Sequence, residues 1–135
     1  MEVGDIKYNQ CVVEHAMRPK NRGTMKKYDA MGKGGSPCGD LMEFYFKIDK
    51  KKMKGKEVEF IKDIKFETMG CAAAIATASA TTEMIKGKTL EEAETLTSEQ
   101  VIGKIGGLPD VKLHCCDLTV SALKAAISDY RLKKK

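Results

Sequence analysis

The sequence predicts an α+β fold, in which a small three-stranded antiparallel sheet is covered by helices and the chain ends in a long helix. Two observations carry this prediction. Residues 28–67 hold three strand-like segments joined by short glycine-rich or lysine-rich connections. Residues 71–130 instead carry apolar side chains at helical spacing, interrupted by glycines and capping motifs. Strands followed by helices are typical of α+β proteins.

The composition is that of one globular domain over residues 1–135, with 42% hydrophobic and 32% charged residues. Five cysteines are an odd number for a disulfide framework, so we expect free thiols in a reducing cytoplasm. The first residues lack a basic segment followed by an apolar run, and no apolar run is long enough to cross a bilayer. We therefore expect neither a secretory signal nor a membrane partner.

The formal net charge of +5 comes with lysine runs at residues 50–56 and 133–135. Nucleic-acid-binding proteins also carry such runs. These two lack interleaved aromatic residues, and they fall in an expected hairpin connection and a tail. We therefore expect a solvated lysine surface and no nucleic-acid partner.

The first expected element is a helix over residues 9–17, because Tyr8, Cys11, Val12 and His15 recur at i, i+3, i+4 and i+7. Pro19 ends this helix, since the residue before a proline is pushed out of the helical region. Cys11 lies on the apolar stripe. We expect it to be a small buried residue and not a ligand.

Three strands follow in the expected order. Residues 28–33 form a short strand that runs into a glycine-rich loop at 32–37. Residues 41–49 and 58–67 alternate between apolar and polar side chains, as strands do. The lysine-rich segment 50–56 is expected to be the hairpin loop between them, so the three strands form an antiparallel meander.

Four helices complete the expected order. The first opens at Cys71 and ends at Lys86-Gly87. Capping boxes at Thr89 and Thr97 begin two short helices, of which the second stops at Gly106-Gly107. After Pro109 the last helix carries apolar side chains at core spacing, at Val120, Leu123, Ile127 and Tyr130.

Three cysteines fall at expected breaks of the backbone, and two of them bring a second side chain that can bind metal. They are Cys38, with Asp40 two residues later, Cys71, and Cys115, which follows His114. They are far apart and form no Cys-x-x-Cys pair, so only the fold can assemble a shared site. Three thiolates and one oxygen or nitrogen donor suit a tetrahedral metal or a small iron–sulfur cluster.

The backbone around these cysteines favours thiolates. Cys71 and Cys115 stand at or just before helix starts, where unpaired amide groups and the positive end of the helix dipole lower a thiol pKa. Cys38 lies in a glycine-rich turn whose amides can point at sulfur. We therefore expect all three as ligands.

The fourth position stays open among Asp40, His114 and Cys116. A carboxylate binds iron less strongly than a thiolate does. A permanent electron-transfer centre would normally use four cysteines. The mixed donor set therefore indicates a site that holds its cargo temporarily.

Two other interpretations fit the residues less well. Three unrelated buried cysteines would rarely all fall at turns and helix ends beside polar neighbours. A cysteine hydrolase needs an imidazole within hydrogen-bond reach and a group that orients it, and only His15 and His114 are available.

The chain resembles the iron–sulfur cluster assembly scaffold proteins of the IscU type, which also occur as the N-terminal domain of NifU. The resemblance runs from about Tyr8 to Tyr130. Its stretches, specific in combination, are Glu14-His15 through Pro19-x-Asn21-x-Gly23, Cys38-Gly39-Asp40, Phe66 through Gly70-Cys71-Ala72, Thr82-Glu83-Met84, Gly87-Lys88-Thr89-Leu90-Glu91-Glu92-Ala93, Gly107-Leu108-Pro109-x-Val111-Lys112-x-His114-Cys115 and Ala125-Ala126-Ile127-x-Asp129-Tyr130.

The resemblance implies an IscU-like fold and a scaffold or carrier rather than an enzyme. It implies that Cys38, Cys71 and Cys115 hold a labile 2Fe-2S cluster, with Asp40 tuning its lability and His114 as an exchanging ligand. A cysteine desulfurase of the IscS or NifS type would deliver sulfur, and iron would come separately. The cluster would pass to apo iron–sulfur proteins, and the cluster-free form could carry zinc.

In many relatives an Hsp70-type chaperone and its J-protein assist this transfer. The chaperone usually binds the segment that matches residues 108–112, where most relatives have a second proline in place of Asp110. The resemblance also allows a homodimer in which two chains share a cluster.

The alternative function is that of a zinc-bound sulfur acceptor like SufU. Cys38, Asp40, Cys71 and Cys115 would then hold zinc tetrahedrally, and one cysteine would accept sulfur from a desulfurase. SufU-type chains usually carry an insertion before the last cysteine and lack the preceding histidine. His114 and the missing insertion therefore favour the cluster scaffold.

Overall fold

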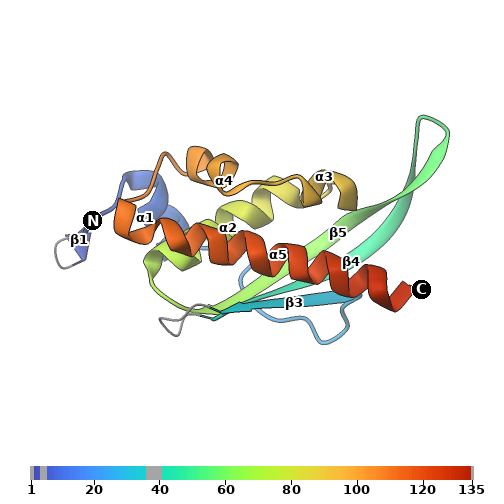
Figure 1. The fold of residues 1–135 in the computed structure, drawn as a ribbon, viewed down its shortest axis with the longest axis horizontal. Helices are drawn as coiled ribbons and strands as arrows, with labels where there is room; N and C mark the ends of the chain where they lie inside the picture. Colours follow the sequence, from blue (N-terminus) through green and yellow to red (C-terminus); the bar gives the residue numbers. More distant parts are fainter. Residues whose placement is uncertain (1, 4–5, 36–40, 135) are drawn as a thin grey trace.

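The computed structural model describes residues 2–3, 6–35 and 41–134. Its main sheet has three antiparallel strands in the order β3-β4-β5, formed by Ala30–Gly35, Leu41–Met53 and Lys56–Met69. The helices lie together on one face of this sheet, and the long last helix runs across it (Figure 1). The predicted α+β fold is confirmed.

The core forms between the helices and one face of the sheet. Met42, Phe44 and Phe46 alternate along β4 and are fully buried. Phe44 pairs with Phe66 of β5, and Phe46 pairs with Ile64, so their side chains share a face. The predicted alternation of this strand is confirmed, and it decides which face the helices cover.

The helices are α1 (Gln10–Met17), α2 (Ala72–Ile85), α3 (Leu90–Glu94), α4 (Ser98–Lys104) and α5 (Leu113–Lys134), with a 3₁₀ turn η1 (Asp110–Lys112) before α5. Both predicted capping boxes are present, at Thr89 with Glu92 and at Thr97 with Gln100. A two-stranded hairpin that the sequence did not predict, β1 (Glu2–Val3) with β2 (Ile6–Lys7), precedes α1. None of the helices in these ranges is long and apolar enough to cross a membrane.

The predicted loop at residues 32–37 is wrong for its first four residues, which belong to β3; the last two lie outside the described residues. The glycines serve close packing here and not a turn. A Cβ on Gly32 would lie 2.2 Å from the backbone nitrogen of Ala126 and 2.5 Å from the carbonyl oxygen of Ala122. Helix α5 therefore packs directly on the backbone of β3, which only glycine permits.

The predicted hairpin loop at residues 50–56 is also wrong in extent. Strand β4 continues to Met53 and β5 begins at Lys56, so the turn is only Lys54-Gly55. Both turn residues have positive φ, 52° and 78°, which matches the right-handed twist of a two-residue hairpin. Lysine-rich composition was a poor guide because cross-strand pairing continues through it.

The prediction for Cys11 is wrong, since this side chain is exposed. The buried face of α1 is centred on Val12 and Val13, while Tyr8 is buried just before the helix. Asn9 caps the helix by accepting a hydrogen bond from the backbone N–H of Val12. The stripe was correctly identified as helical, but its centre lies one residue further along the chain.

Candidate metal centre

Two of the three predicted cysteine ligands meet in the fold. The Sγ atoms of Cys71 and Cys115 lie 3.5 Å apart, although the residues are 44 positions apart in sequence. This distance is far above the roughly 2.05 Å of a disulfide. It is close to the roughly 3.8 Å that separates two sulfurs bound tetrahedrally to one metal at about 2.3 Å each. The pair is thus spaced to share a metal.

Local structure explains how Cys71 reaches this place. Strand β5 ends at Met69, Gly70 follows, and Cys71 is the extended N-cap residue of α2, with φ −77° and ψ 177°. Its side chain makes no capping hydrogen bond. The sulfur therefore lies beside the first amides of α2, which have no partner inside the helix.

Cys115 lies in the first turn of α5 and is fully buried, whereas Cys71 is partly exposed. A buried hydrogen bond between Thr77 of α2 and Thr119 of α5, 2.9 Å long, holds the two helices in register. The Thr119 hydroxyl donates to the carbonyl oxygen of Cys115 at 3.0 Å. The two helix starts are therefore brought together by helix packing, which a single sequence does not reveal.

The site favours a negative sulfur at Cys71. The pKa of the Cys71 thiol is lowered to about 5, and the main cause is the hydrogen bond with Cys115. The amides of Ala74 and Ala73 and the positive charge of Lys112 also lower this pKa, whereas burial raises it. This agrees with the prediction that a cysteine at a helix start is acidic. The surroundings of Cys71 therefore favour its thiolate form.

Lys112 and Tyr8 border this pair, and the sequence prediction missed both. The negative charge of Cys71 raises the pKa of Lys112. Burial, followed by the charge of Cys71, raises the pKa of Tyr8. A signal for Lys112 was present, since it precedes Cys115 by three residues, a spacing that shares a face in a helix. Nothing local pointed to Tyr8, which precedes the predicted first helix.

His114 lies beside the pair, with its Nε2 atom 3.6 Å from the Sγ atom of Cys115. An imidazole nitrogen and a thiolate bound to the same tetrahedral metal are also about 3.6 Å apart. Across residues 2–3, 6–35 and 41–134, however, no three His, Cys, Asp or Glu side chains form a complete metal-holding group. Cys38 and Asp40 lie outside the described residues, so their place at the site stays a prediction.

The other two cysteines lie apart from the pair. Cys116 is buried, and its thiol donates to the carbonyl oxygen of Ser98 at 3.4 Å. Burial raises the pKa of Cys116 to about 11, which keeps the thiol protonated. Cys116 therefore fits the predicted role of a small side chain that fills space in the core, and it is disfavoured as the fourth ligand. Cys11 lies 3.9 Å from the carbonyl oxygen of Lys104, on a different surface.

His15 is used structurally. Its Nδ1 atom lies 2.8 Å from the hydroxyl of the buried Ser79, and its Nε2 atom lies 3.6 Å from Glu83. Ser79 also accepts a hydrogen bond from the backbone N–H of Lys20. The ring therefore ties the end of α1 to α2, which counts against a nucleophile and base pair with a cysteine.

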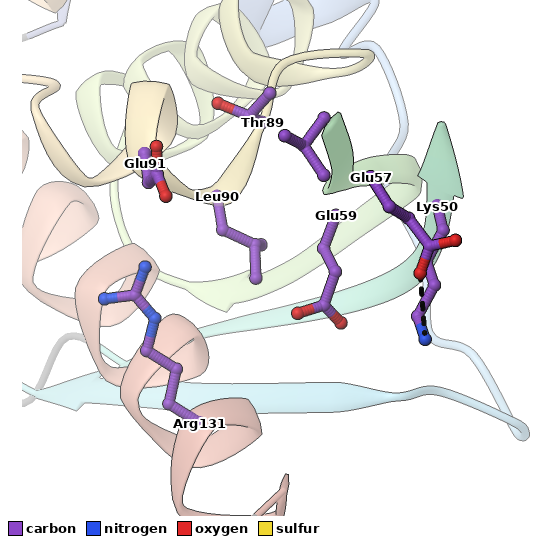
Figure 2. A pocket seen from close by; sticks show the side chains of 8 residues that line it. Lys50, Glu57, Glu59, Thr89, Leu90, Glu91 and Arg131 are labelled. Atoms are coloured by element: carbon purple, nitrogen blue, oxygen red, sulfur yellow. Dashed lines mark ion pairs between the residues drawn. The ribbon is translucent and has the colours of Figure 1, made fainter. Parts of the chain in front are cut away.

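Two hollows on the described surface are lined by neither Cys71 nor Cys115. A hollow of about 220 Å³ lies near the start of β5, lined by Lys50, Glu57, Val58, Glu59, Thr89, Leu90, Glu91 and Arg131 (Figure 2). Cys71 follows the opposite end of β5. A smaller hollow of about 140 Å³ is nearer, lined by Leu41, Glu43, Glu67, Thr68 and Met69. Of these, Leu41 and Met69 are exposed apolar side chains.

Comparisons with known proteins identify the family of the chain. Residues 7–135 match the family model described as NifU-like N terminal domain. The chain is 48% identical over 124 residues to iron-sulfur cluster assembly scaffold protein IscU 1 of Archaeoglobus fulgidus, covering 91% of this chain and 76% of that protein. It is 41% identical over 131 residues to IscU of Haemophilus influenzae, covering 94% and 98% respectively.

Solved structures show the same fold. A crystal structure from Fervidobacterium islandicum AW-1, described as a putative iron-sulfur cluster assembly scaffold protein for the SUF system, superposes with a TM-score of 0.68 at 28% identity. The match covers 89% of this chain and 96% of that one. Together with the family model, these similarities show that the chain belongs to the NifU-like N-terminal domain family, which includes the IscU scaffold proteins.

Proposed function

We propose that this chain is an iron–sulfur cluster assembly scaffold, a carrier and not an enzyme, whose cargo is a labile 2Fe-2S cluster. The observation that carries the proposal is the 3.5 Å separation of the Cys71 and Cys115 sulfurs. The surroundings of Cys71 favour its thiolate form, and a basic side chain, Lys112, adjoins the pair. Cys38 is the proposed third cysteine ligand.

The fourth donor in this proposal is Asp40 or His114. The Nε2 atom of His114 already lies at a ligand-like distance from Cys115. Asp40 is proposed on the donor chemistry alone. Either group binds iron less strongly than a thiolate does, which suits a cluster that must leave.

Sulfur enters by exchange between sulfurs. The thiolate of the cysteine pair attacks the outer sulfur of a persulfide on a cysteine desulfurase, and the desulfurase cysteine leaves as a thiolate. Each transferred sulfur then takes two electrons from an external reductant, a thiol or an iron–sulfur protein, to become sulfide. Ferrous iron is supplied separately, and apo iron–sulfur proteins accept the finished cluster. A chaperone that binds residues 108–112 and a cytoplasmic location belong to the same proposal.

Anaerobic reconstitution with ferrous iron, cysteine, a desulfurase and a thiol reductant tests this function. We expect iron and sulfide to bind in equal amounts, with the visible absorption and Mössbauer spectrum of a 2Fe-2S cluster. Cys71→Ser and Cys115→Ser should lose most of the bound iron, because each removes one member of a minimal ligand set. Cys11→Ser is the matched control and should retain it, since Cys11 lies on another surface. Full iron binding in both site variants would overturn the proposal.

A zinc-bound sulfur acceptor is the second candidate, because the spacing of the Cys71 and Cys115 sulfurs also fits one tetrahedral zinc ion. The same donors would hold zinc in a tetrahedral site. Metal analysis after the reconstitution distinguishes the two candidates. Zinc that persists at one ion per chain, with sulfur uptake but no iron, would favour the acceptor.

A further inference from the structure

Strand β4 extends well beyond its neighbour β3. The paired residues run from Leu41 with Gly35 to Phe46 with Ala30, and Asp29 continues the contact by binding the carbonyl oxygen of Phe46 and the N–H of Ile48. Beyond this point, up to Met53, no described strand pairs with the outer edge of β4. Only β5 accompanies it, and the two strands project from the body as a twisted ribbon (Figure 1).

This unpaired edge retains hydrogen-bonding capacity. The N–H of Ile48 points outward, since it is bonded to Asp29 on the β3 side. Alternate residues of an antiparallel strand direct their backbone groups to the same side, so those of Lys50 and Lys52 also face outward. The N–H of Lys50 is bonded to the side chain of Asp49. The outward groups of Lys52 and the carbonyl of Lys50 have the geometry that an added strand would use.

The edge strand and turn of this ribbon are rich in positive charge. Residues 47–56 contain six lysines and one aspartate, a net charge of +5, and Glu57 and Glu59 of the partner strand reduce it to +3 over residues 47–59. Lys50 is paired with Glu57 (Figure 2), and Lys51 donates to the carbonyl of Gly87. The exposed lysines 52, 54 and 56 form no ion pair with any described residue.

We propose that the outer edge of β4 over residues 47–53 docks an extended acidic segment of a partner protein as an additional strand. Backbone bonding along the edge would supply the pairing, and the lysines would select an acidic sequence. Lysines on an edge also discourage unspecific pairing, so the charge restricts which strand can add. The site is separate from the cysteine pair.

Other occupants fit less well. A second copy pairing edge to edge would set lysines against lysines. The bases of a nucleic acid would find few stacking platforms, because residues 47–59 contain no aromatic residue.

The probe is a short fluorescein-labelled peptide of alternating glutamate and valine, and the readout is fluorescence anisotropy with the full-length protein. The variant Lys52→Glu with Lys54→Glu should weaken binding about tenfold, since each exposed charge contact contributes up to about 1 kcal/mol. The matched control, Lys104→Glu with Lys124→Glu, makes the same charge change on α4 and α5 and should leave binding unchanged. Cluster reconstitution should be unaffected in both variants, which separates this proposal from the proposed function.

Backbone pairing is tested on the peptide, so that folding of the protein is not in question. N-methylation of alternate peptide amides should abolish binding in one of the two possible patterns and leave it in the other. Equal binding of both methylated peptides would overturn the strand-addition geometry. No binding of the parent peptide at low salt, or tighter binding of a single-stranded DNA of equal charge, would overturn the acidic-segment proposal.

Discussion

The sulfurs of Cys71 and Cys115 face each other at 3.5 Å across the starts of α2 and α5. One sulfur is partly exposed and the other is buried. Cys71 can therefore be reached from solvent, while Cys115 is sheltered. The hydrogen bond between the two thiols is the main cause of the lowered pKa of Cys71.

Alkylation of metal-free protein with iodoacetamide should show the acidity of Cys71. Because its pKa is lowered from 9.0 to about 5, the rate at Cys71 should stay near its maximum from neutral pH down to about pH 6 and fall through pH 5. Peptide mapping by mass spectrometry identifies the modified residue. In guanidinium the same residue should lose reactivity below about pH 8.5, and an identical profile in both states would refute the prediction.

The lowered pKa of Cys71 also makes the free energy of unfolding depend on pH. Between about 5 and 9 the unfolded chain binds more protons at Cys71 than the folded chain does. The contribution of Cys71 to the free energy of unfolding is therefore complete above the unfolded pKa and is lost as the pH falls toward 5. In denaturant unfolding of metal-free protein, the free energy of unfolding of Cys71→Ser should rise less steeply with pH than that of the parent protein. Parallel curves would contradict this.

Lys112→Gln should move the alkylation midpoint of Cys71 upward, because the positive charge of Lys112 helps to hold the thiolate. Raising the ionic strength should reduce the difference between parent and variant, since the side chain of Lys112 is partly exposed to solvent and its charge can be screened. Lys104→Gln, which removes a charge at the end of α4, is the control. An unchanged midpoint in Lys112→Gln would show that hydrogen bonds alone account for the acidity.

Thr119→Val should lower the free energy of unfolding by about 1–3 kcal/mol, because it removes the hydroxyl that bonds Thr77 and the carbonyl oxygen of Cys115 inside the core. Iron binding should also weaken, since these contacts hold the register of the two helix starts. Ser121→Ala, at an exposed position of the same helix, should change neither quantity. Normal stability of Thr119→Val would show that the hydrogen bond is dispensable.

Gly32→Ala and Gly103→Ala should have opposite effects on the melting temperature. A Cβ at Gly32 would collide with the backbone of α5, which cannot move away easily, so we expect a loss of about 1–3 kcal/mol or more. A Cβ at Gly103 meets nothing within 4 Å and sits in helix α4, so alanine should stabilise by about 0.5–1 kcal/mol. Equal melting temperatures would refute the close-packing explanation.

Asp40→Ala should slow cluster transfer to an apo-ferredoxin, because it removes the proposed weak donor whose exchange lets the cluster leave. Circular dichroism of the acceptor follows the transfer after reconstitution. Asp117→Ala, an exposed carboxylate on α5, serves as the control. Faster release from Asp40→Ala would exclude this role.

Much of the fold could be predicted because its signals are local. The capping boxes at Thr89 and Thr97 are each contained in four residues, and the alternation of Met42, Phe44 and Phe46 spans one strand. The error at Gly32 has the opposite cause, because the decisive neighbour there is α5, which lies far away in sequence. In the lysine-rich hairpin the pairing residues are close in sequence, and the error came from taking lysine-rich composition as a sign of a loop.

The sequence by itself determined the order of strands and helices, the cysteines that can bind metal and the places where helix starts would make them acidic, because backbone propensity, capping and donor chemistry act over a few residues. Only the tertiary structure decided that Cys71 and Cys115 meet, that Lys112 and Tyr8 border them and that Cys11 and Cys116 do not. Those outcomes depend on how α5 packs across β3 and α2. That packing is set by the sum of many distant contacts, and no short motif encodes it.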